Sequence, residues 1–327
     1  MYEYRRPVPP PRIPPAPAGS RKFDQPTPSA KMVIYATSVR LPSPHEVMNS
    51  KALADAVRGS FLPLDSQSTG DWEHRALVDG DFSLMQPDSG ACFQLSVRPG
   101  SRTSRPKVLE ASDDEKWSLA IDLEMEQKLK NRTYELELSI DVQSALTAGD
   151  PKQAILVQMA LVDRIAGASH AAVCDVEGRR YFEKGGWKWP GGGRGFDVRD
   201  HVTVHVISMP AATGRRSWCH THGMVKFGRY ELEVFDVPDS LREAAADLLW
   251  DLGNAAVDGA GMKPLDQVGS ESFPLLIRKS TRSPPAHFHG PVLELVDLHG
   301  AGRPAEKGAP MALAARADEA KQPPFEE

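Results

Sequence analysis

Three side chains that can bind metal or exchange protons fall within four residues of this sequence: Cys219, His220 and His222. Alternate residues of a β-strand share a face, so an extended chain here would point His220 and His222 together and Thr221 to the other side. Two imidazoles on one face are a suitable pair of ligands for zinc. The expectation is a set of polar histidines on a sheet surface or in a hydrogen-bonded network, and the alternative is a metal site.

The sequence leaves the third ligand open. His287 and His289 repeat the His-x-His spacing, and His201 and His205 occupy the strand predicted just before the cluster. No partner stands at a fixed spacing of the kind that paired cysteines give in zinc modules. The expectation is therefore no cofactor, with zinc bound by His220, His222, His287 and His289 as the alternative.

A carboxylate pair follows the histidines. Glu231 and Glu233 share one face of a predicted strand over 231–236, with Leu232 and Val234 on the other face. Two neighbouring carboxylates can raise each other's pKa and divide into acid and base. More often such glutamates form the solvated face of an amphipathic strand. If this strand pairs antiparallel with the histidine strand, imidazoles and carboxylates meet across the ladder.

A glycine-rich loop at 185–195 is the last candidate. It lacks the Gly-Lys-Ser/Thr ending of a phosphate-binding loop and carries Pro190 in its middle. Trp187 and Trp189 flank a lysine and are candidates for a surface that docks a partner. The alternative is an exposed hairpin tip.

Hydrophobic periodicity and capping signals predict a mixed α+β fold, a largely antiparallel sheet with helices packed on one face. A second interpretation divides it into two related strand–helix–strand halves, 30–130 and 131–300. Ser240-Leu-Arg-Glu243 predicts a capping box for the helix at 240–253. The expected strands are 31–40, 77–86, 91–97, 134–142, 171–176, 201–207, 231–236, 273–278 and 292–298, and the expected helices are 43–58, 117–129, 151–167 and 240–253.

Composition separates the ends from the middle. Residues 1–29 are proline-rich and 301–327 are rich in Ala, Glu, Lys and Pro, so both are predicted to be disordered tails around a globular region, 30–300. The net charge of −5 argues against a general nucleic-acid binder. Three widely spaced cysteines give no disulfide framework, and no apolar run is long enough to span a membrane. These features predict a soluble cytoplasmic protein.

The run from Thr221 to Val234, Thr-His-Gly-Met-Val-Lys-Phe-Gly-Arg-Tyr-Glu-Leu-Glu-Val, resembles a signature of uncharacterised bacterial domain-of-unknown-function families. That signature is Thr-x-Gly-Leu/Met, two residues, Phe-Gly, then a Pro-Glu-Leu-Glu strand, and this chain has Tyr230 in place of the proline. The resemblance is close over 217–236 and loose over 30–280. It implies a bacterial accessory protein, sited in some genomes near secretion or toxin–immunity loci, and carries no catalytic activity.

The leading expectation is therefore a soluble, non-enzymatic protein that binds an unidentified protein partner, of an immunity-like or secretion-associated kind. The alternative is a metal-binding protein or metal-dependent enzyme that uses the cluster Cys219-His220-Thr221-His222.

Overall fold

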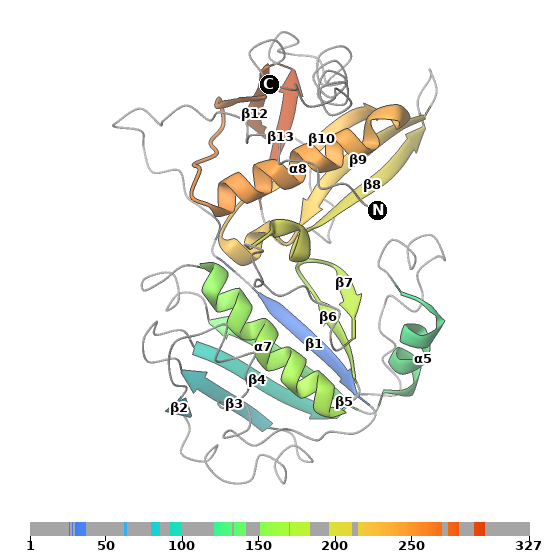
Figure 1. Cartoon of the computed structure of the whole chain (residues 1–327), viewed down its shortest axis with the longest axis vertical. Helices are drawn as coiled ribbons and strands as arrows, with labels where there is room; N and C mark the ends of the chain where they lie inside the picture. Colours follow the sequence, from blue (N-terminus) through green and yellow to red (C-terminus); the bar gives the residue numbers. More distant parts are fainter. Residues whose placement is uncertain are drawn as a thin grey trace, which may run out of the picture. The chain divides into compact units, whose positions relative to one another are not determined.

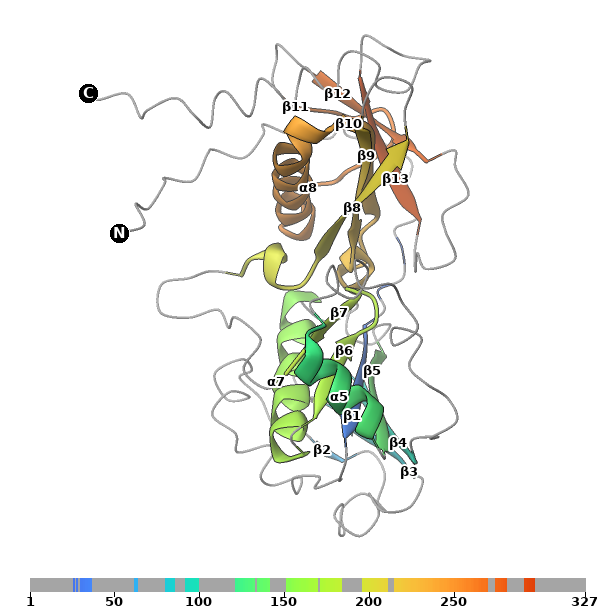
Figure 2. The ribbon, with the colours of Figure 1, turned by 90° about the vertical axis from the view of Figure 1, so that its right-hand side faces the viewer.

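The chain is an α+β protein with two compact units, each built on its own sheet (Figures 1 and 2). The computed structural model describes residues 26, 28, 30–36, 62–63, 80–85, 92–99, 121–132, 134–141, 151–169, 171–183, 196–210, 215–269, 274–280 and 291–297. The seven-stranded unit holds the described residues of 28–201 together with 225–228, and the six-stranded unit holds residue 26 and those of 202–224 and 229–297.

The sheet of the seven-stranded unit is antiparallel throughout, in the order β2-β3-β4-β5-β1-β6-β7. Its interior strand β1 alternates between buried and half-buried residues. Strand β5 lies after residue 130 and pairs with β1 and β4, which lie before it. The predicted halves 30–130 and 131–300 therefore share one sheet. The strands are β1 Lys31–Ala36, β2 Leu62–Pro63, β3 Gly80–Met85, β4 Cys92–Pro99, β5 Tyr134–Asp141, β6 Ala172–Asp175 and β7 Arg180–Phe182.

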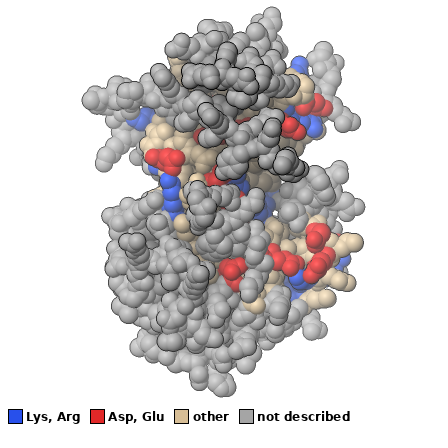
Figure 3. Space-filling model, viewed as in Figure 1, with Lys and Arg blue, Asp and Glu red and all other residues tan. Residues whose placement is uncertain are grey.

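Two helices pack on this sheet: α5 (Leu123–Asn131) and α7 (Pro151–Ser169). Helix α5 begins later than predicted because the Asp122 carboxylate accepts the Met125 backbone N–H at 2.8 Å and so caps it. Proline opens α7, as expected of a residue without an N–H. Acidic and basic side chains lie intermixed over α5 (Figure 3), and its (i, i+4) pairs Glu124–Lys128 and Glu126–Lys130 each contribute a few tenths of a kcal/mol.

The six-stranded unit has the strand order β11-β12-β13-β10-β9-β8, in which only the pairing of β10 with β13 is parallel. Three short 3₁₀ turns, η3 Val198–Asp200, η4 Met224–Phe227 and η5 Asp239–Leu241, precede or connect its elements. Its strands and helix are β8 Thr203–Pro210, β9 Arg215–His222, β10 Glu231–Pro238, α8 Arg242–Val257, β11 Gln267–Gly269, β12 Pro274–Lys279 and β13 Val292–Asp297.

Helix α8 covers one face of this sheet (Figure 2). Leu248, Leu249 and Leu252 pack against an apolar sheet face that includes Cys219 and Leu232. The burial of this face explains why Cys219 of β9 and Leu232 and Val234 of β10 are apolar, while the residues between them are polar or aromatic. A register shift after Val234 brings Val237 to the same core. The opposite face of the sheet is the one that carries the histidines.

The predicted capping box at Ser240 is wrong. Residues 239–241 form the 3₁₀ turn η5, the helix begins at Arg242, and its N-cap residue Leu241 makes no side-chain capping bond. The helix is instead tied to the sheet by Arg242, whose Nε donates to the Ser217 hydroxyl at 2.7 Å.

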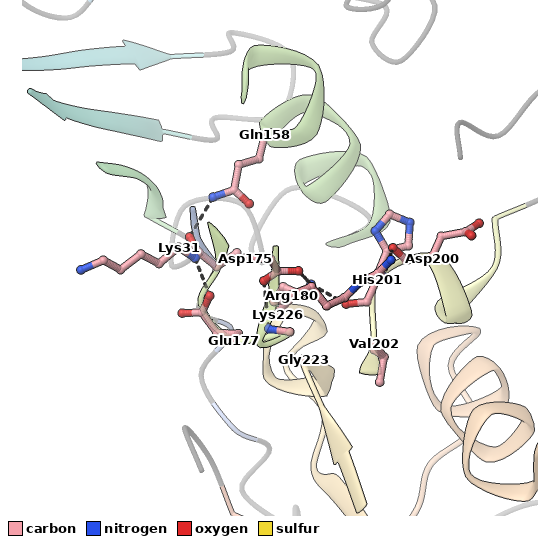
Figure 4. A network of polar contacts seen from close by, with 12 residues as sticks. Lys31, Gln158, Asp175, Glu177, Arg180, Asp200, His201, Val202, Gly223 and Lys226 are labelled. Atoms are coloured by element: carbon pink, nitrogen blue, oxygen red, sulfur yellow. Dashed lines mark hydrogen bonds and ion pairs between the residues drawn. The ribbon is translucent and has the colours of Figure 1, made fainter. Parts of the chain in front are cut away.

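A buried polar network occupies the seven-stranded unit (Figure 4). The Lys226 ammonium donates to the Asp175 carboxylate and, at 2.6 Å, to the His201 carbonyl. Asp175 also accepts the Gly178 N–H at 2.9 Å, so its second oxygen is bound within the β6–β7 turn. Lys226, Asp175 and His201 are almost fully buried. The ammonium therefore joins three segments that are distant in the sequence.

Glu177 borders this network and titrates near neutrality. Burial, with the Asp175 charge nearby, raises the pKa of its carboxyl from 4.5 to about 7, although the Lys31 backbone N–H donates to it at 2.7 Å. The folded state thus holds this proton up to about pH 7, whereas the unfolded chain releases it near 4.5. The contribution of Glu177 to the free energy of unfolding is complete below pH 4.5. It falls by about 3 kcal/mol as the pH rises from 4.5 to about 7.

Glu177→Gln is accordingly expected to remove this slope, because glutamine stays neutral at every pH. The measurement is the protection of β1 and β6 amides against hydrogen exchange between pH 4.5 and 7.5, compared with the parent. Parallel pH profiles for the parent and the variant would show that Glu177 does not titrate in this range.

Several expectations fall outside the described residues: both tails, the helix at 43–58 and the glycine-rich loop. Trp187 and Trp189 lie in that loop, and His287 and His289 lie in a second undescribed segment. Within the described part, no helix combines the length and apolarity that a membrane crossing requires.

Candidate metal centre

Two adjacent strands of the six-stranded unit, β8 and β9, bring three histidines together. They pair antiparallel, with His205 opposite His220 and Thr203 opposite His222. Because side chains alternate along a strand, His220 and His222 share one face, and His205 joins them there from the neighbouring strand. This is the face opposite helix α8.

The three rings are in mutual contact. The Nε2 atoms of His220 and His222 are 3.1 Å apart, and one nitrogen from each of the three histidines lies within 4.8 Å of the others. Ring centroids are separated by 4.6 Å between His205 and His222, 4.8 Å between His220 and His222, and 5.6 Å between His205 and His220. His220 and His222 are buried, and His205 is half-buried.

This spacing fits a tetrahedral metal ion. Zinc bound by imidazoles at ~2.0–2.1 Å places two ligand nitrogens about 3.3 Å apart. The 3.1 Å between the Nε2 atoms of His220 and His222 is close to that value, and a ring nitrogen of His205 lies within 4.8 Å of both rings' ligand atoms. Imidazole rings hold a metal ion in their neutral form, through the nitrogen that carries no proton. Among the described histidines, cysteines and carboxylates, His205, His220 and His222 are the group whose potential ligand atoms lie close enough together to hold one metal ion.

A row of charged residues continues from the histidines across the sheet. Glu233 on β10 lies opposite His220, and Glu294 on β13 lies opposite Glu233. Arg278 on β12 lies opposite Glu294 and binds it through two hydrogen bonds of 2.9 Å each. The Trp218 indole donates to Glu233 Oε2 at 3.1 Å. The expected meeting of a carboxylate with an imidazole across the ladder is thus realised in register between Glu233 and His220.

Glu231 has a different role from Glu233. Its carboxylate accepts the Thr221 hydroxyl at 2.7 Å and the Gly223 N–H at 2.9 Å. Gly223 has φ 108°, a conformation that glycine reaches without a Cβ clash. The Thr221 hydroxyl also accepts the Leu232 N–H at 2.8 Å. Glu231 therefore holds the turn that ends the histidine strand.

Cys219 is separated from the histidines by the sheet. It lies in the apolar core beneath α8, and burial raises the pKa of its thiol to about 12. A thiol that stays protonated at neutral pH is neither a nucleophile nor a ready zinc ligand. Of the cluster Cys219-His220-Thr221-His222, only the two histidines contribute to the site.

His205 is the third imidazole that the structure brings to the pair, and His201 is not part of the cluster. His201 stacks on Phe196 in the seven-stranded unit, with ring centroids 4.6 Å apart. Sequence analysis missed Glu294, Arg278 and Trp218. Trp218 could have been found, because it stands two residues before His220 and so shares its face.

Comparisons were made with protein-family models, with curated proteins and with solved structures. The resemblance of residues 217–236 to a domain-of-unknown-function signature stays a prediction. No family model, curated protein or solved structure matches this chain, and the function is therefore inferred from the geometry of the site.

Proposed function

We propose that this protein binds a zinc ion through His205, His220 and His222. The observation that carries the proposal is the convergence of three imidazole nitrogens within 4.8 Å on one sheet face. Zinc is preferred because imidazole ligands suit it and because a tetrahedral site needs only three protein ligands and a water. Cu²⁺ and Ni²⁺ bind imidazoles as well, so relative affinities are part of the test.

A bound ion would cross-link β8 and β9. Because the ligands come from two strands, the folded chain presents the complete set and the unfolded chain does not, so metal binding stabilises the fold. At a free zinc concentration one hundred times Kd, the gain is about 2.7 kcal/mol.

Zinc content of protein purified without a histidine tag tests the proposal. After equilibrium dialysis against low-micromolar zinc, we expect one equivalent per chain. A His205→Ala, His222→Ala double variant, which retains the fold's apolar core, is expected to bind far less than one equivalent. A parent protein that stays metal-free, or a double variant that keeps a full equivalent, would overturn the proposal.

The expectation of an immunity-like or secretion-associated protein partner stays a prediction. It depends on the resemblance of residues 217–236, and no contact among the described residues bears on it.

A further inference from the structure

We propose that the ion held by His205, His220 and His222 keeps an open fourth position, which carries an exchangeable water and accepts a monodentate anion in its place. The anion reaches this position along the outer strand β8. The inference depends on the proposed function and deepens it, because it names the class of ligand that the metal centre accepts.

The three ligands occupy one side of the ion. All three project from the same face of two neighbouring strands, His205 from β8 and the other two from β9. Their ligand atoms lie within 4.8 Å of one another. Because the three ligands rise from the sheet, the fourth vertex of a tetrahedral ion points away from it. The backbone of β8 and β9 therefore does not supply the fourth ligand.

The nearby thiol and carboxylates are engaged elsewhere. Cys219 lies in the core on the other face of the sheet. Glu231 accepts the Gly223 N–H at 2.9 Å, and Glu233 accepts the Trp218 indole N–H at 3.1 Å. Within the part of the chain that the structure describes, no further histidine, cysteine or carboxylate joins the three ligand atoms. The vertex is thus left to a water or to a ligand from solution.

The approach from solvent lies along β8. His205 is half-buried, whereas the two ligands on β9 are buried. In the strand order of the described residues, β8 is the outermost strand of its sheet. Val206 and Ile207 follow the ligand directly, and each is 39% exposed. Ile207 shares the face of His205 and lies opposite Trp218 in register, so it borders the path to the ion.

The charge of the ion favours an anion. Imidazole ligands are neutral, so a divalent ion keeps both of its charges. A donor atom in the fourth position lies about 2 Å from the ion, where the Coulomb attraction is strongest. The single charge of Glu233 lies outside the group of ligand atoms, and the charge of Glu294 is compensated by two hydrogen bonds from Arg278. Attraction by the ion therefore exceeds repulsion by the carboxylates.

Cobalt-loaded protein tests the open position, because the visible absorption of Co²⁺ changes with the number and kind of its ligands. Thiocyanate, at an ionic strength held constant with perchlorate, is expected to shift these bands until one anion is bound per ion. Perchlorate alone coordinates poorly and should leave the spectrum unchanged. Cobalt content after gel filtration in thiocyanate checks that the anion has replaced a ligand and has not extracted the metal.

Ile207→Trp and Val206→Trp are a matched pair for the approach. The two positions have the same exposed fraction, but only Ile207 shares the face of His205. Ile207→Trp is expected to slow thiocyanate association several-fold in stopped-flow measurements, and Val206→Trp is expected to match the parent. Equal association rates in all three cobalt-loaded proteins would contradict an approach along this face of β8.

The outcomes separate this inference from the proposed function. If the parent binds one equivalent of Co²⁺ and thiocyanate leaves its spectrum unchanged, a protein ligand fills the fourth position, so the inference fails and the metal site stands. A sulfur-to-cobalt charge-transfer band in the near ultraviolet before thiocyanate is added would identify that ligand as a thiolate and also overturn the inference. A parent that binds neither Zn²⁺ nor Co²⁺ overturns the proposed function itself.

Discussion

Replacing His220 with alanine is expected to lower zinc affinity on the order of a hundredfold. His220 lies opposite His205 in register, and its Nε2 is 3.1 Å from the Nε2 of His222. Structural zinc sites bind with ~10–16 kcal/mol from four ligands, so one ligand contributes roughly 3 kcal/mol, which corresponds to about two decades of affinity. Competition with a chromophoric chelator measures the change directly.

Cys219→Ala is the matched control for this variant. The two residues are adjacent, but Cys219 lies in the core on the other face of the sheet. Its removal is expected to leave zinc affinity unchanged, although it creates a small cavity that lowers stability. Equal losses of affinity in both variants would mean that the thiol takes part or that binding follows global stability, and either result contradicts a three-histidine site.

Lys226→Met is expected to destabilise the seven-stranded unit by about 3–5 kcal/mol. The lysine side chain is fully enclosed and is paired with Asp175, which is itself buried. Methionine fills a similar volume, so the loss comes from leaving a carboxylate buried without its cation and from losing the bond to the His201 carbonyl. Denaturant unfolding followed by amide exchange in β6 measures the change for this unit.

Two controls separate charge from packing. Lys130→Met removes a half-exposed lysine that pairs with Glu126 on α5, and its expected cost is under about 0.5 kcal/mol. Adding Asp175→Asn to Lys226→Met removes the uncompensated charge and should recover part of the stability. If Lys226→Met costs no more than Lys130→Met, the buried pair does not hold the unit together.

Local pattern predicted the histidine pair correctly. The common face of His220 and His222 depends only on the two-residue period of a strand, which is a property of neighbouring residues. The sequence left the third ligand open among His201, His205, His287 and His289. The meeting of His205 with the pair depends on the register of β8 against β9, which the spacing of residues does not fix.

The spacing of the two glutamates does not predict their different contacts. Glu231 and Glu233 have the same spacing and the same predicted face, yet Glu231 binds the turn at Gly223 and Glu233 lies opposite His220. The difference arises from the left-handed backbone at Gly223, which presents an N–H to the first residue of β10. Glu294 joins the row only through a parallel pairing of distant segments, a non-local contact that no local signal encodes.

X-ray absorption at the zinc edge of the loaded protein tests the central claim most directly, because it identifies the ligand atoms. The account predicts three imidazole nitrogens at ~2.0–2.1 Å, with the outer-shell scattering typical of histidine rings, and a single light atom in the fourth position. Alanine at His205 should reduce the imidazole contribution by one ring. A sulfur ligand at ~2.3 Å, or a zinc ion surrounded by oxygen alone, would contradict it.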